Sequence, residues 1–298
     1  AAVAHAAGVP LVVDAAWGAH LGLHPALPPH PLAAGADAVV VSAHKTLPAV
    51  SQAAVVLART SSSGGLLDAG RLERAFEATH TTSPHGGILA SADAARALVQ
   101  RDGAELAAGL VRRVAAARER LRAVPGLVVL DGPHVEAAKL VTVLPATGAS
   151  GVDVENDLLA AGFPVELADR DTVVAMVTLS DDDAVVAAFA DALAVAVERH
   201  RGTPRPVVPG AAWSVRPEQV LTPREAFFAP AEVVPAAAAV GRVAAELVAP
   251  YPPGVPVLAP GERVTAAALD SLLAARDGGA RIAYAADPTL ATITVVGA

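Results

Sequence analysis

The chain has 298 residues, of which 53% are apolar and 3% aromatic, and this length accommodates more than one domain. A formal net charge of −8, with basic residues scattered among acidic ones, argues against a nucleic-acid partner. The absence of cysteine excludes disulfides, thiolate metal sites and cysteine nucleophiles, and the cytoplasm is then the expected default location.

The N-terminal residues AAVAHAAG predict the last turns of a helix, and they lack the basic region that begins a signal peptide. Uncharged windows in the sequence are short or interrupted by proline, so we expect no membrane span and no membrane partner. The sequence does not begin with an initiator methionine, since its only methionine is Met176. We therefore expect the chain to be the C-terminal part of a longer protein.

Short apolar strands are predicted next. PLVVD, residues 10–14, follows the helix-ending Gly8 and finishes in a carboxylate. A proline-rich loop, a brief helix and a turn at 35–37 lead to VVV at 39–41, and AAVVLAR at 53–59 gives a third strand. Continuous Val and Leu without polar alternation predict buried strands in a parallel or mixed sheet that is covered on both faces.

The rest of the chain predicts further domains. Residues 91–123 show a helical pattern, interrupted at Asp102 and Gly103. The order β-β-α-β-β-α between 127 and 200 is typical of a small α+β domain, and RGTPRPVVPG at 201–210 is a linker by composition. The predicted domains are 1–124, 125–203 and 204–298.

Lys45 follows a strand that is predicted to be buried, where an unpaired ammonium is costly. Such a lysine either extends its amine to solvent or has a catalytic role. A lysine amine becomes nucleophilic when its pKa is lowered. Asp14 ends the other strand, and ligands bind at the carboxyl ends of parallel strands. Pyridoxal phosphate needs a lysine for its covalent bond and a carboxylate beside its pyridine nitrogen. The pairing of Asp14 with Ser-x-His-Lys at 42–45 therefore points to this cofactor.

Several blocks of the sequence resemble the Orn/Lys/Arg decarboxylase family of fold type I pyridoxal-phosphate enzymes. The family pattern is roughly D-x-A-[HW]-G-A-H followed by S-x-H-K, and this chain has DAAWGAH from Asp14 and SAHK from Ser42. ATHTTSPHGGILAS at 78–91 resembles the family's TTSP loop. LTPREAFFAP at 221–230 and APYPPGVPVLAPGE at 249–262 resemble its C-terminal domain. The resemblance covers essentially the whole chain.

This resemblance implies an α/β fold. It consists of the C-terminal half of a fold type I, aspartate aminotransferase-like large domain, a small α+β domain and the family's C-terminal domain. A homodimer or higher homo-oligomer is also implied. The sequence departs from many relatives at Ala15, where they have Glu, and from some at Gly87. In the family a preceding region supplies the main phosphate-binding loop and the group that stacks on the cofactor ring.

The resemblance also implies roles for residues around the two motifs. Lys45 would bond covalently to the cofactor, and Asp14 would pair with its pyridinium nitrogen. Ala16 would pack under the ring, where a larger side chain would displace it. Trp17 would lie near the ring oxygen or the substrate.

Further roles are implied for polar residues. Ser42 and His44 would flank the cofactor phosphate and its bond to the lysine, and His44 is a catalytic candidate as proton donor to the substrate carbon. Thr82 and Ser83 would reach the phosphate, across a dimer interface in one arrangement. Glu225 is a candidate for receiving the distal cation of the substrate.

The activity implied is decarboxylation of arginine, lysine or ornithine to agmatine, cadaverine or putrescine. Two alternatives stay open: another pyridoxal-phosphate enzyme, such as an aminotransferase or lyase, or a noncatalytic fragment that lacks part of the cofactor site. The PREAFFA and YPPGVP blocks argue against the first alternative. The sequence alone leaves the choice of basic amino acid open.

Two other patterns have simpler interpretations. His20, His24 and His30 lie in a proline-rich loop without metal-ligand spacing, so we expect loop or interface histidines and no metal site. Ser180 with Asp183, just before an apolar helix, predicts a capping box that starts this helix.

Overall fold

A computed structural model describes residues 1–206, 211–251 and 254–297. The described chain forms two compact units, each assembled from separate stretches of sequence. The first contains residues 1–121, 130–140 and 176–191, and the second contains 122–129, 141–175 and 192–298. The predicted linker at 201–210 lies partly outside the described residues, and the predicted domain limits stay a prediction.

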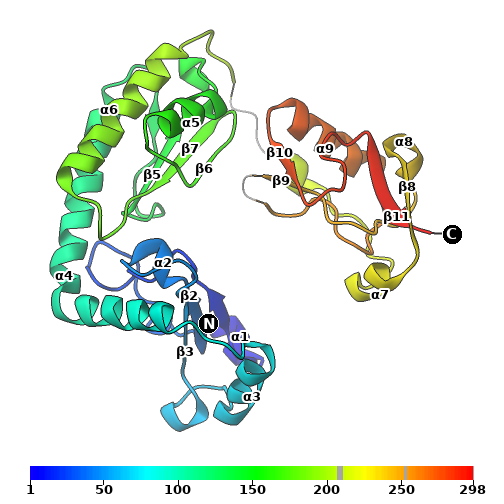
Figure 1. Cartoon of the computed structure of the whole chain (residues 1–298). Coiled ribbons are helices and arrows are strands. Elements are labelled where there is room, and N and C mark those ends of the chain that lie inside the picture. Colours follow the sequence, from blue (N-terminus) through cyan, green and yellow to red (C-terminus); the bar gives the residue numbers. More distant parts are fainter. Residues whose placement is uncertain (207–210, 252–253, 298) are drawn as a thin grey trace. The chain divides into compact units, whose positions relative to one another are not determined.

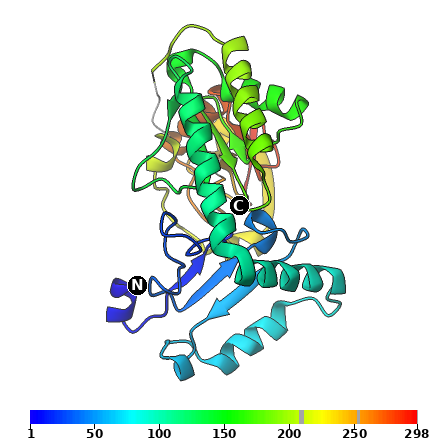
Figure 2. The same ribbon diagram turned by 90° about the vertical axis from the view of Figure 1, so that its left-hand side faces the viewer.

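The first unit contains a three-stranded mixed sheet, seen as adjacent blue arrows in Figure 2. It consists of β1 (Val12–Asp14), β2 (Ala38–Val41) and β3 (Val55–Ala58). Strand β2 runs parallel to β1 and antiparallel to β3, which confirms the mixed sheet expected from the sequence. The predicted N-terminal helix is also present as α1 (Ala2–Ala6).

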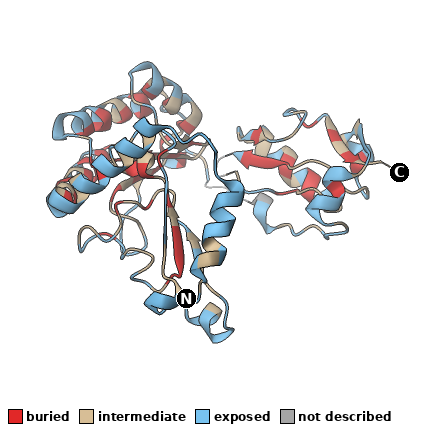
Figure 3. Cartoon of the chain, turned by 60° about the horizontal axis from the view of Figure 1, so that its bottom comes forward, coloured by how far each residue is buried: buried red, intermediate tan, exposed pale blue. Residues whose placement is uncertain are grey.

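Only the middle strand of this sheet is buried. Val39 of β2 is 0% exposed, whereas Val12 of β1 is 58% exposed and Val56 of β3 is 47% exposed. Figure 3 shows the buried middle strand in red. The prediction of a sheet covered on both faces is therefore wrong for β1 and β3. Both are edge strands, so only β2 has a neighbouring strand on each side.

A buried carboxylate joins the segments that lead into this sheet. Asp37, just before β2, accepts hydrogen bonds from the N–H groups of Leu11 at 2.9 Å and Leu66 at 3.1 Å, and its Oδ2 lies 2.7 Å from Nε2 of His5. The Leu11, His5 and Leu66 donors favour the ionised form and lower the pKa of Asp37 to about 2.

The prediction of a brief helix before the turn at 35–37 is wrong, because residues 31–35 form consecutive turns instead.

Four helical segments follow β2 in the first unit, and the last of them ends where the second unit begins (Figure 1). They are α2 (Ala43–Thr46), the 3₁₀ turn Ser61–Ser63, α3 (Ala69–Thr79) and α4 (Gly86–Arg122). The sequence did not predict α3, which begins at a local N-cap, where the Asp68 side chain accepts from the Arg71 N–H at 2.7 Å.

Helix α4 continues through the predicted interruption. It runs unbroken for 37 residues, although Figure 2 shows that it bends along its length. Gly103 is buried inside it, and a Cβ there would lie 3.4 Å from Cδ2 of Leu23. The glycine that weakens the local helix propensity thus permits close packing, which is why propensity alone gave the wrong result here.

A four-stranded sheet in the order β4-β5-β7-β6 lies mainly in the second unit. Its strands are β4 (Val128–Val129), β5 (Lys139–Val143), β6 (Leu167–Ala168) and β7 (Thr172–Met176). The 3₁₀ turn Pro145–Thr147 and α5 (Gly151–Ala160) belong to the second unit, and α6 (Asp183–Arg199) runs from the first unit into the second. The predicted β-β-α-β-β-α order is confirmed. Strands β5 and β7 alternate between buried and half-buried residues, as expected for strands with one face on a core.

The cap of α6 differs from the prediction. Asp182, not Ser180, receives the helix N–H, since its Oδ1 accepts from Val185 at 2.8 Å. Asp183 instead faces Arg113 of α4 at 3.5 Å. Three consecutive aspartates made the sequence pattern fit more than one starting residue, so the predicted capping box is wrong by two positions.

The C-terminal part of the second unit builds its core from two strand pairs and a helix. β8 (Ala231–Pro235) pairs with β11 (Thr292–Val296), and β9 (Ala249–Tyr251) pairs with β10 (Arg281–Ala283), both antiparallel. The remaining segments are the 3₁₀ turn Ala211–Ser214, α7 (Pro223–Phe228), α8 (Ala236–Ala239) and α9 (Ala266–Asp277). Leu258, Leu272 and Val295, each 0% exposed, lie in this core.

Candidate active site

The two sequence motifs come together because their strands are parallel neighbours. Asp14 ends β1 opposite Val40 of β2. Beyond the paired strands the two segments that follow β1 and β2 stay side by side, because the Ser42 N–H donates to the Ala16 carbonyl at 3.3 Å. The Asp14 carboxylate and the Ser42–Lys45 segment therefore leave the same edge of the sheet, where ligands bind in α/β folds.

A hollow of about 420 Å³ opens beside Asp14, which is within the size range of small-molecule sites. Asp14 Oδ1 accepts the N–H of Ala16 at 3.0 Å, and its Oδ2 accepts no hydrogen bond from the described residues. Small side chains form much of the wall, so a flat ring has room there. The lining residues are Asp14, Ala15, Ala16, Trp17, Gly18, Leu21, Pro28, Glu136 and Lys139.

Lys45 lies in the short helix α2 that follows β2. It is half-buried, and within the described chain its amine forms no hydrogen bond or ion pair. Its neighbour His44 is fixed, since Nδ1 lies 2.9 Å from the carbonyl oxygen of Ala53. A carbonyl only accepts, so Nδ1 carries the proton and Nε2 is the ring atom left for other partners. The Ser42 side chain forms no cap hydrogen bond to α2.

A second group of charged residues reaches the hollow from residues 131–140. The Lys139 ammonium lies 5.8 Å from the centroid of the Trp17 ring and 3.1 Å from Oε2 of Glu136. The other oxygen of Glu136 lies 3.3 Å from Nε2 of His20, a histidine that is 1% exposed. These contacts link Trp17, Lys139, Glu136 and His20 into one cluster, which we call the Lys139 cluster.

Opposing effects set the pKa of Glu136 in the Lys139 cluster. Burial raises the pKa of Glu136, but the hydrogen bond from His20, the Lys139 ammonium and the N–H of Ala138 outweigh burial and lower it to about 2. Glu136 is therefore ionised at neutral pH.

Arg118 of α4 holds the segment that carries the Lys139 cluster. Its side chain is 7% exposed and donates to Asp131 Oδ1 at 2.9 Å. The same guanidinium donates to the backbone carbonyls of Glu136 at 3.1 Å and Lys139 at 2.8 Å. Because five rigid donors share one plane in arginine, a single buried side chain fixes the backbone beneath both charged residues.

The remaining predicted site residues lie elsewhere. Thr82 and Ser83 are exposed in the loop between α3 and α4, and the Ser83 N–H donates to the Thr81 hydroxyl. Glu225 belongs to a capping box of α7, where its Oε2 accepts from the Thr222 N–H at 2.7 Å. The Thr222 donors lower the pKa of Glu225. This carboxylate thus has a structural function, and its substrate role stays a prediction.

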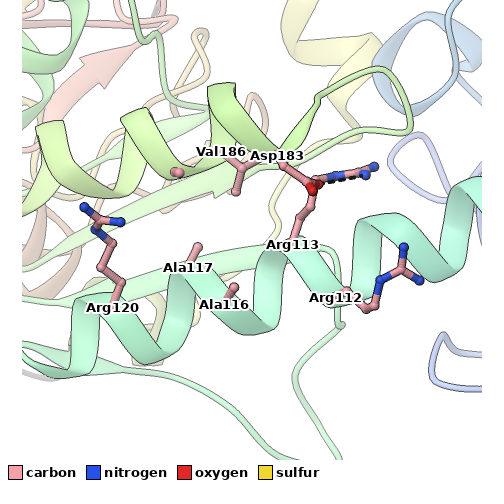
Figure 4. A pocket seen from close by; sticks show the side chains of 8 residues that line it. Arg112, Arg113, Ala116, Ala117, Arg120, Asp183 and Val186 are labelled. Carbon is pink, nitrogen blue, oxygen red and sulfur yellow. Dashed lines mark hydrogen bonds and ion pairs between the residues drawn. The ribbon is translucent and has the colours of Figure 1, made fainter.

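A second hollow of about 370 Å³ lies between α4 and α6. It carries Arg112, Arg113 and Arg120, and Figure 4 shows these three side chains spread along the helix instead of converging on one point. Arg113 faces Asp183, and Arg120 pairs with Asp191. These contacts join α4 to α6, and we assign them a structural role.

Sequence reasoning missed His20, Glu136 and Lys139. The sequence predicts a loop or interface histidine at His20, but Glu136 approaches it across 116 residues of sequence. No local pattern signals such a contact.

Among the described residues no group of three or more His, Cys, Asp or Glu could hold a metal ion. Within the same ranges, none of the helices combines the length and hydropathy of a membrane span.

Comparison with protein families gives two matches. The Orn/Lys/Arg decarboxylase major domain matches residues 1–148, and the Orn/Lys/Arg decarboxylase C-terminal domain matches residues 208–282. Both descriptions agree with the family resemblance found in the sequence motifs.

Curated relatives give the same result. The chain is 30% identical to an arginine decarboxylase of Halalkalibacterium halodurans, over 98% of this chain and 61% of that relative. It is 29% identical to an arginine decarboxylase of Bacillus subtilis, over 99% of this chain and 61% of that relative. The chain thus spans about three-fifths of the length of these curated relatives.

Solved structures confirm the predicted fold class. The Francisella novicida lysine decarboxylase LdcF superposes with a TM-score of 0.77 at 19% identity, covering 96% of this chain and 53% of that one. The Escherichia coli constitutive lysine decarboxylase gives a TM-score of 0.76 at 20% identity, covering 97% and 55%. At these identities the likeness concerns the fold alone.

Proposed function

Because the chain belongs to the Orn/Lys/Arg decarboxylase family, we propose that the protein decarboxylates a basic amino acid with pyridoxal phosphate as its cofactor. Arginine is the substrate to test first, since the two curated relatives at about 30% identity are named arginine decarboxylases. The observation that carries the proposal is the placement of Asp14 and the Lys45 segment at the carboxyl ends of two neighbouring parallel strands.

The described residues fit this cofactor. The hollow offers a pyridine ring a carboxylate with one free oxygen and a wall of small side chains. Lys45 is not among the lining residues, but its amine has no partner among the described residues and its segment leaves the same edge of the sheet as Asp14. When bound, pyridoxal phosphate supplies an electron-accepting ring for the bond from Cα to the carboxylate. The Lys45 amine is the group that would attach it, and Ala16 leaves space for the face of the ring.

Asp14 would hold the proton on the ring nitrogen. Its Oδ1 is oriented by the Ala16 N–H at 3.0 Å, so Oδ2 is the oxygen that can face a ligand. A carboxylate at this position favours a protonated nitrogen because opposite charges attract across a short distance. Replacement of Asp14 by Asn would keep the shape of the side chain and remove its charge.

His44 would move a proton through Nε2. The Ala53 carbonyl fixes the proton on Nδ1, so a neutral His44 presents Nε2 as a base, and the protonated ring presents it as an acid. The role proposed for His44, protonation of the substrate carbon, therefore requires the doubly protonated ring. Ser42 and the Thr82–Ser83 loop are proposed to contact the cofactor phosphate, the loop from a second copy in a homodimer.

Release of carbon dioxide tests the proposal. The chain is incubated with pyridoxal phosphate and arginine, lysine or ornithine labelled at the carboxyl carbon, and the released label is measured together with the amine product. We expect release from arginine above the other two and loss of release in Lys45→Ala. Exchange of the amino group without carbon dioxide would instead favour an aminotransferase.

A further inference from the structure

The chain uses lysine at only two positions. Among its 22 basic residues, Lys45 and Lys139 are the lysines, and every other basic position is arginine. Lys139 lines the same hollow as Asp14, the proposed partner of the cofactor nitrogen. Arginine and lysine differ in geometry and hydration. Because every other basic residue is arginine, lysine at these two positions indicates that an amine is required there.

The Lys139 amine is buried and has unused donors. Its side chain is 12% exposed, and Nζ is shielded from solvent without a hydrogen bond of acceptable geometry among the described residues. Its ion-pair partner Glu136 lies 3.1 Å away. An ammonium carries three N–H donors, and burying them unsatisfied is costly unless a ligand accepts them.

Glu136 is already occupied and cannot satisfy these donors alone. Its Oε1 accepts the Ala138 N–H at 2.7 Å and faces His20 at 3.3 Å, which leaves only Oε2 for Lys139. Arg118 fixes the backbone carbonyls of both residues. Lys139 is thus held in place by neighbours that leave part of its hydrogen-bonding capacity unused, and its side chain lines the hollow.

We propose that Lys139 is a ligand-binding residue of this hollow and that its ammonium receives an anionic oxygen of the bound molecules. Two sources carry such an oxygen: the carboxylate of the amino-acid substrate and the ring oxygen of the cofactor. The inference rests on the proposed function for the identity of these ligands. Glu136 and His20 act as positioning residues that set the place of the amine.

A purely structural role explains the composition less well. If Lys139 only paired with Glu136 and covered Trp17, arginine would serve as well, because a guanidinium pairs with carboxylates bidentately and stacks on aromatic rings. A compact ammonium is favoured where a small cavity must hold a point charge beside a ligand. The lysine in an arginine-rich chain therefore agrees with ligand binding.

Having two lysines allows a direct test by NMR. The full chain is produced with ¹³C at the lysine ε-carbon, which gives two signals that Lys45→Arg and Lys139→Arg assign. Arginine and agmatine are then titrated separately, because these probes differ only in the carboxylate. Pyridoxal phosphate and its 3-O-methyl ether are titrated as a second pair that differs in the ring oxygen.

We expect the Lys139 signal to respond to arginine at about tenfold lower concentration than to agmatine, because agmatine lacks the carboxylate that would accept the charged N–H groups of Lys139. A response to pyridoxal phosphate that its methyl ether lacks would identify the ring oxygen as the source. Equal responses within both pairs, or a Lys139 signal that none of the four probes moves, would overturn the inference.

The same spectra separate this inference from the proposed function. Pyridoxal phosphate should change the Lys45 signal if that lysine attaches the cofactor. An unchanged Lys45 signal with a carboxylate-dependent Lys139 signal would remove the proposed function and leave the anion site in place. In Lys139→Met, which keeps the length of the side chain, the Lys45 signal is the remaining readout, and it should respond to arginine and agmatine at similar concentrations. As a matched control, Arg120→Met removes a cation from an ion pair outside the hollow and should leave the preference for arginine over agmatine unchanged.

Discussion

His20 Nε2 lies 3.3 Å from Oε1 of Glu136, although 116 residues separate them in the sequence. The contact joins the segment after β1 to the segment before β5 and leaves the other oxygen of Glu136 to Lys139. Removing the charge of Glu136 would leave a buried ammonium without an anion.

Glu136→Gln is therefore expected to destabilise the first unit by about 2 kcal/mol, below the 3–5 kcal/mol of a fully buried pair because Glu136 keeps 20% exposure. Urea unfolding followed by circular dichroism measures the loss. Glu198→Gln removes a carboxylate from the exposed pair with Arg201 and serves as the matched control. Equal stability of Glu136→Gln and the wild type would contradict the assigned pairing.

We expect Asp37 to contribute to stability in a pH-dependent way. Its pKa is about 2 in the folded chain against an ordinary value of 3.8, so folding favours the ionised carboxylate. The resulting stabilisation is fully present above about pH 5 and is lost as the pH falls through the range from about 4 to 2. Stability curves of wild type and Asp37→Asn should converge on acidification. Curves that stay parallel down to about pH 2 would show that the folded-state pKa is not lowered.

The cap of α6 gives a local test. Asp182→Ala removes the acceptor of the Val185 N–H and should lower stability by about 1 kcal/mol. Ser180→Ala, two residues earlier, should change it by much less, because Asp182 and not the Ser180 hydroxyl accepts the N–H at the start of α6. Thermal unfolding of the two variants compares them directly. A larger effect at Ser180 would support the capping box expected from the sequence.

Local patterns predicted the parts of this fold that depend on local chemistry. The apolar run before Ser42 predicted β2, and the change of periodicity after residue 127 predicted the β-β-α-β-β-α order. The pairing of Asp14 with the Lys45 segment was also accessible, because parallel neighbours place their carboxyl ends together. The exposure of β1 and β3 was not, since an apolar run looks the same in a middle strand and in an edge strand.

The Lys139 cluster could not be predicted in this way. Glu136 and Lys139 lie more than a hundred residues from Trp17 and His20, and only the fold places them at one hollow. Gly103 illustrates the same limit, because its helix-breaking tendency is overcome by packing against Leu23. Long-range contacts override local propensity at both places.

Covalent labelling would show whether Lys45 is the residue that attaches pyridoxal phosphate. The chain is mixed with pyridoxal phosphate, reduced with borohydride, digested and analysed by mass spectrometry, with only two lysine-containing regions to compare. We expect a phosphopyridoxyl group on Lys45, with weaker labelling at low cofactor concentration in Asp14→Asn. Labelling confined to Lys139 or the N-terminal amine, or none at Lys45 under saturating cofactor, would contradict it.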